Sequence, residues 1–141
     1  KPSPNPVQAD DARRGVAYAQ KRASRELKKN APLILQRARG WKVVGIGGVH
    51  SFSVRKQAAD GQAHYSLTDV QQALKLRIAK SDDEVAQLNN PLNPREALRF
   101  ISTEVTNLIL ISGFLKAMNL KRVHILSANL SDGLFVSPDY W

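Results

Sequence analysis

Residues 42–51 read Lys-Val-Val-Gly-Ile-Gly-Gly-Val-His-Ser, a short aliphatic run that is interrupted by adjacent glycines. The run at 42–46 predicts a short buried strand that Gly47-Gly48 ends, and a helix is expected from the glycines to about Gln57. Glycine between a strand and a helix lets backbone N–H groups approach an anion closely, and the helix dipole adds to the attraction.

This glycine loop matches no specific nucleotide-binding motif. No Gly-Lys-Ser/Thr follows it, so it is not a P-loop, and a dinucleotide fingerprint would need glycine where His50 stands. Two interpretations therefore stay open. The loop is either a tight turn with a structural role, or an anion site formed by Gly47, Gly48, Val49 and His50.

Helix signals account for most of the remaining chain. The three prolines in residues 1–8 predict an extended lead-in to a single unit at 9–141, in which 9–29 has the helical period with an alanine-rich buried stripe. Further helices are expected at 32–39, from Asp69 to about Lys80 with Thr68 as cap, after Ser81, and after Asn93. Residues 104–119 are apolar nearly all round and predict the central buried helix.

A second strand is expected at 122–126, after the buried helix. Alternating strands and helices indicate an α/β fold with parallel strands. Ligands of open α/β sheets bind beyond the carboxyl ends of the strands. The loop after this strand, with Asn129, Ser131 and Gly133, is therefore expected to join the glycine loop in lining one cleft.

The positive charge lies mostly in the first third of the chain. The net charge is +9, and residues 1–42 carry eleven basic and three acidic side chains. A basic patch attracts polyanions, although a solvated helix face would have the same composition. The candidate polyanion face is formed by Arg14, Lys21, Arg22, Arg25 and Lys28. Tyr18 is the only aromatic residue among them, so nucleic acid is a possible partner but not the favoured one.

Several kinds of site are not supported. The chain has no cysteine, its three histidines have no metal-ligand spacing, and no Gly-x-Ser-x-Gly elbow supports a serine nucleophile. No catalytic residue and no metal ligand is therefore assigned, and Glu84 and Glu104 are expected to have structural roles at helix starts. The apolar segment 108–118 is too short to span a membrane, and no signal peptide is evident, so a cytoplasmic location is expected.

The order of these features resembles the exopolyphosphatase and guanosine pentaphosphate phosphohydrolase family, from about Ala9 to Val136. The similar parts are the basic helix with the strand and glycine loop at 40–48, then Leu-Thr-Asp-Val at 67–70, Asn-Leu-Ile-Leu at 107–110, the strand at 120–127, and Leu-Ser-Asp-Gly-Leu at 130–134. The resemblance implies part of a ribonuclease-H-like domain of the superfamily of sugar kinases, actin and heat-shock chaperones. It also implies Mg²⁺-dependent hydrolysis of phosphoanhydride bonds in polyphosphate or guanosine pentaphosphate.

The resemblance covers only the later part of the second half of such a protein. The chain does not begin with Met, and the family's acidic general base and two earlier phosphate loops have no counterpart in it. The chain alone is therefore expected to bind no Mg²⁺ and to be inactive. It is also expected to self-associate, either through a bare sheet edge or through the aliphatic helix at 104–119. Val49 stands where the family commonly has Thr, and Ser131 where it has Arg. A non-catalytic polyanion-binding module that uses the basic helix is the alternative.

Overall fold

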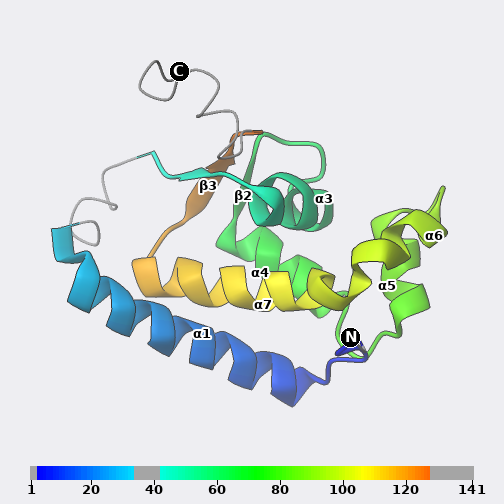
Figure 1. Cartoon of the computed structure of the whole chain (residues 1–141), viewed down its shortest axis with the longest axis horizontal. Helices are drawn as coiled ribbons and strands as arrows, with labels where there is room; N and C mark the ends of the chain where they lie inside the picture. The colour runs from blue at the N-terminus through cyan, green and yellow to red at the C-terminus, as the bar shows by residue number, and fades with distance from the viewer. Residues whose placement is uncertain (1–2, 34–41, 128–141) are drawn as a thin grey trace, which may run out of the picture.

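The computed structural model describes residues 3–33 and 42–127, in which helices pack beside one small sheet (Figure 1). The α/β class is confirmed. The elements in chain order are α1 (Ala9–Asn30), β1 (Val44–Gly45), the π-helix η1 (Val49–Val54), α3 (Arg55–Ala58), β2 (His64–Ser66), α4 (Leu67–Lys75), α5 (Asp82–Asn89), α6 (Pro94–Ala97), the 3-10 helix η2 (Leu98–Phe100), α7 (Ile101–Met118) and β3 (Arg122–Ile125).

The sheet has the order β1-β3-β2 and is mixed rather than purely parallel. The two predicted strands pair in parallel, with Val44 beside His124. The sequence did not predict β2, which pairs antiparallel to β3 with Tyr65 opposite Val123. Three residues are too few to show the alternation by which a strand is recognised.

Helices α1 and α7 lie side by side and run in the same direction (Figure 1). They approach closely at Gly113, where an added Cβ would lie 2.5 Å from the Cβ of Ala19 and 2.8 Å from the backbone oxygen of Val16. The close approach that the alanine-rich stripe predicted is confirmed. Small side chains make it possible, because nothing longer separates the two backbones.

The predicted central buried helix is confirmed as α7, which packs against α1, α4, α5 and η1. It begins at Ile101 rather than at Glu104, because α6 and η2 lead into it without a break. By length and composition alone, Pro94–Met118 would be able to cross a membrane. Core helices of soluble proteins have the same length and apolar composition. In this protein Val105, Leu108 and Leu115 of α7 are buried among the other elements.

The helix caps agree with the sequence at α5 and differ at α4. Ser81 caps α5 in a capping box with Glu84, as its sequence predicted. The cap of α4 is Ser66 and not Thr68, because the Ser66 hydroxyl accepts from the backbone N–H of Asp69 at 3.1 Å. This helix ends at Lys75, not near Lys80. Beyond it the N–H of Ala79 donates to the carbonyl of Val7, which holds the chain away from the helical path.

Candidate phosphate-binding edge

The glycine loop follows β1 and leads directly into η1. Gly47 has a φ of +81°, which a glycine adopts without strain, and its carbonyl accepts the N–H of Ser51 at 2.9 Å. A side chain on Gly47 or Gly48 would meet no atom within 4 Å. The space beside these two residues is therefore open. The first N–H groups of a helix have no partner within it, so those of Gly48, Val49 and His50 are available to an anion.

His50 belongs partly to the protein interior. Its Nδ1 lies 2.5 Å from the hydroxyl of fully buried Tyr65. The ring also packs over Gly45, where an added Cβ would lie 2.6 Å from two ring atoms. Burial lowers the pKa of His50, which favours the neutral ring. A ligand at the loop could use only the backbone N–H and the second ring nitrogen of this residue.

The first turns of η1 and α3 connect the glycine loop to the end of β3. The Ser51 hydroxyl donates to the carbonyl of Leu126 at 3.1 Å, and Nη1 of Arg55 donates to the Ser127 hydroxyl at 3.3 Å. The structure thus adds Arg55 to the residues that the sequence singled out. In the sequence, Arg55 follows Gly48 by seven residues, or about two helical turns, and this spacing would have predicted a cation near the glycine loop.

The second predicted loop, with Asn129, Ser131 and Gly133, lies outside the described residues, as does most of the predicted helix at 32–39. Among the described residues no group of three or more His, Asp or Glu side chains could hold a metal ion. The described part of the edge, residues 45–55 and 124–127, contains no carboxylate, which is the ligand that Mg²⁺ prefers. These residues alone do not fit Mg²⁺.

A buried polar cluster lies behind this edge, and the sequence did not predict it. The cluster joins four elements through Ser53 and Gln57 (η1 and α3), Arg77 (after α4), Asn89 (α5) and Glu104 (α7), all buried. Nε and Nη2 of Arg77 donate to Oδ1 of Asn89 at 3.0 and 2.7 Å, and Nδ2 of Asn89 donates to Oε2 of Glu104 at 3.0 Å. Gln57 donates to the backbone carbonyl of Glu104 at 3.0 Å. We call this set the Glu104 cluster.

Glu104 is therefore not a simple helix-start carboxylate. Burial raises the pKa of its carboxyl group, against the opposing effects of Lys56, the Ser53 hydroxyl and Arg77. By contrast, Glu84 has the structural role that was predicted for it. The Glu104 cluster ties η1 and α3 to α5 and α7, and so fixes the helix that follows the glycine loop.

We expect Glu104 to make the protein less stable as the pH rises. The unfolded chain releases this proton near 4.5, whereas the folded protein keeps it to a higher pH. The folded state then binds more protons, so the free energy of unfolding falls as the pH rises through this window. Glu104→Gln removes the effect. Urea unfolding at several pH values should show the variant gaining stability relative to the wild type from about pH 4.5 upward, and then levelling.

Glu96→Gln, on α6, is the control for loss of an exposed carboxylate. A difference between Glu104→Gln and the wild type that stayed constant with pH, or that fell, would contradict the prediction.

The predicted polyanion face forms a straight stripe along α1. At 3.6 residues per turn, Arg14, Lys21, Arg25 and Lys28 lie close to one line, with Tyr18 in the same line and Arg22 beside it; all are exposed. The buried residues Ala12 and Val16 lie on the opposite side. From residue 14 to residue 28 the stripe extends about 21 Å. We call these six residues the basic stripe.

The cations of the basic stripe have few and weak partners. Arg14 pairs with Asp11, while Arg22 and Arg25 share Glu26, and all of these side chains are largely exposed. Exposed ion pairs contribute little stability and exchange readily for other anions. With the other described residues, Lys21 and Lys28 form no ion pair.

Comparison with known proteins found no matching family model, no matching curated protein and no matching solved structure.

Proposed function

We propose that this chain supplies part of the phosphate-binding cleft of a phosphoanhydride hydrolase that acts on polyphosphate or guanosine pentaphosphate. One observation supports the proposal: the carboxyl ends of the parallel strands β1 and β3 lie side by side, and Arg55, at the start of α3, donates to Ser127 just beyond β3. Ligands of α/β sheets bind at such an edge. The order of motifs that resembles the exopolyphosphatase family supports the same assignment, including a ribonuclease-H-like architecture and a cytoplasmic location.

In this proposal the chain binds and positions the substrate. The backbone N–H groups of Gly48, Val49 and His50 would hold phosphate oxygens at the start of η1, and Arg55 would neutralise their charge. Phosphoryl transfer depends mainly on positioning and charge stabilisation, so such groups contribute directly to it. The general base and the carboxylates that hold Mg²⁺ would come from outside the described residues. The chain alone is expected to release no phosphate.

Titration with tripolyphosphate tests this proposal, with amide chemical shifts as the readout. We expect the amides of residues 47–51 to move, and Arg55→Gln to weaken binding about tenfold because a charged hydrogen bond is lost. Arg95→Gln, which removes an exposed arginine from α6, should leave binding unchanged. Unmoved loop amides, or equal losses in the two variants, would contradict the proposal.

A second candidate function rests on the basic stripe. Its exposed cations extend about 21 Å along one face of α1, which suits a linear polyanion. If the amides of α1 respond to tripolyphosphate and those of residues 47–51 do not, the chain is better described as a polyanion-binding module. Self-association also stays a prediction; the exposed side chains of Val44, Ile46 and Leu126 on and beside the sheet support it.

A further inference from the structure

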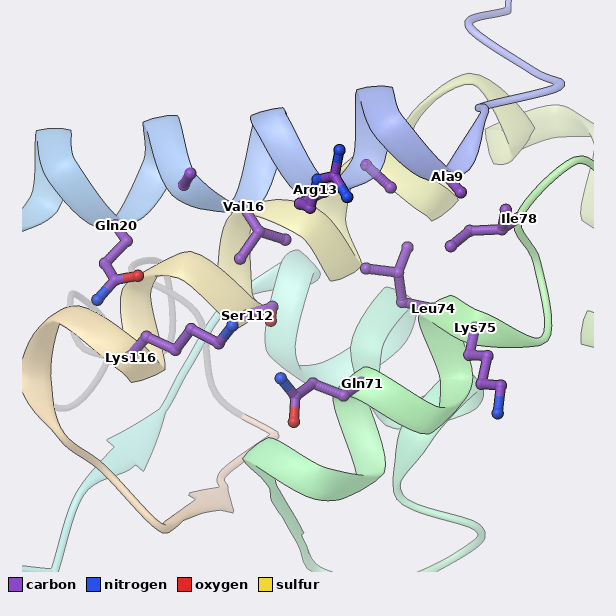
Figure 2. A pocket seen from close by; sticks show the side chains of 12 residues that line it. Ala9, Arg13, Val16, Gln20, Gln71, Leu74, Lys75, Ile78, Ser112 and Lys116 are labelled. Atoms are coloured by element: carbon purple, nitrogen blue, oxygen red, sulfur yellow. The ribbon is translucent and has the colours of Figure 1, made fainter.

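A cavity, which we call the groove, lies between α1, α4 and α7 (Figure 2). Its volume is about 350 Å³, which is within the range of small-molecule sites. Side chains from α1, α4 and α7 line it together. The proposed hydrolase cleft uses none of these residues.

Four polar side chains gather toward one end of the groove, which we call the polar end, and most of the aliphatic side chains lie toward the other (Figure 2). Lys116 and Ser112 of α7, Gln71 of α4 and Gln20 of α1 lie toward the polar end. Leu74, Ile78 and Ala9 lie toward the other end, where Lys75 stands beside Leu74. A ligand that fits both ends must itself have a polar head and an apolar body.

The charged side chains of the groove determine which charge the polar group of the ligand should carry. Arg13, Lys75 and Lys116 line the groove, and none of the acidic residues that the structure describes does. Arg13 is partly neutralised by Asp10 at 3.0 Å, whereas Lys75 and Lys116 pair with no other described residue. The groove therefore attracts an anion, and Lys116 is the cation at its polar end.

Ser112 gives independent evidence for a polar ligand atom. This side chain is 1% exposed, and its hydroxyl has no hydrogen-bond partner among the described residues, although it lines the groove. Buried hydroxyl groups are nearly always hydrogen-bonded, because losing water without a replacement is unfavourable. A ligand oxygen at this end of the groove would accept the missing bond.

We propose that the groove binds an amphipathic organic acid. Its carboxylate would accept hydrogen bonds from Lys116 and from the Ser112 hydroxyl, with the amide groups of Gln20 and Gln71 beside it. Its aliphatic body would lie against Leu74 and Ile78. The site is separate from the proposed hydrolase cleft, so either proposal can fail without the other.

Octanoate is a suitable probe, because it has both parts of the expected ligand. Acetate keeps the carboxylate without the chain, and 1-octanol keeps the chain without the charge. Each buried methylene contributes roughly fourfold in affinity. In titrations followed by amide and methyl chemical shifts at α4 and α7, we expect octanoate to bind at least about tenfold more tightly than either truncated probe. Acetate or 1-octanol binding as tightly as octanoate would overturn the proposal.

Three variants test which residues bind the carboxylate of octanoate. Lys116→Gln keeps most of the side chain and should weaken octanoate binding about tenfold through loss of one charged hydrogen bond. Ser112→Ala should weaken it several-fold, while the thermal midpoint stays the same or rises because an unpartnered hydroxyl is removed. Lys121→Gln removes an exposed lysine outside the groove and should have no effect. Equal losses at Lys116 and Lys121, or unchanged binding by Ser112→Ala, would overturn the assignment.

Discussion

Gly113→Ala should destabilise the protein by about 3 kcal/mol, because it overpacks a close contact between α1 and α7. The new Cβ would lie 2.5 Å from the Cβ of Ala19, and 2.8 Å from both the N of Gln20 and the carbonyl oxygen of Val16. Two of these three atoms belong to the backbone, so no rotamer change relieves the clash. The whole of α1 must move away from α7, which loosens the packing around Val16.

Two further glycines provide matched controls for this substitution. At Gly15 the added Cβ would lie 2.8 Å from Cγ2 of Ile109, a side-chain atom that can move, so Gly15→Ala should cost less. At Gly48 it would meet nothing within 4 Å, and Gly48→Ala should change the free energy of unfolding by under about 0.5 kcal/mol. Urea unfolding should rank the three losses as Gly113, Gly15 and Gly48. A Gly113 variant as stable as the Gly48 variant would show that α1 does not pack this closely.

Asn89→Ala is the second substitution with a large expected effect, again about 3 kcal/mol of destabilisation. Asn89 accepts two hydrogen bonds from Arg77 and donates one to Glu104, and all three residues are buried. Its removal leaves two donors of a buried guanidinium unpaired and takes a donor from a buried carboxyl group. Buried charged groups without partners are among the most costly defects in a protein.

Gln87→Ala is the control on the same helix. Gln87 is exposed, and its side-chain amide donates only a long hydrogen bond among the described residues, 3.4 Å to the carbonyl of Pro91. We expect a change within about 0.5 kcal/mol, as for most exposed substitutions. Chemical denaturation of both variants measures the difference. If Asn89→Ala proved as mild as Gln87→Ala, the Glu104 cluster would not hold the four elements together.

The sequence predicts that two members of the Glu104 cluster are buried. Asn89 follows Val85 by four residues and Ala86 by three, so it shares their buried face of α5. Glu104 follows Ile101 by three residues and precedes Leu108 by four, so it shares their buried face of α7. A polar residue on each of two buried faces predicts that they meet. Which partner each would find depends on how the helices cross, and the sequence contains no signal for that.

Local chemistry determined most of the elements from the sequence alone. The length of α1 follows from its helical period and its charged ends, Ser81 and Glu84 start α5, and the glycines end β1 before η1. Such signals depend on neighbours within about four residues, so they can be recognised in the sequence without the tertiary structure. The basic stripe is predictable for the same reason, because a helix places its residues regularly.

Only the tertiary structure decided the contacts between distant segments. The pairing of His64 with His124 across β2 and β3, the link from Arg55 to Ser127, and the groove around Ser112 each join residues far apart in the chain. These contacts are set by how closely α1 approaches α7 and by the order of the strands. Both follow from the packing of many side chains at once, whereas the sequence patterns report one element at a time.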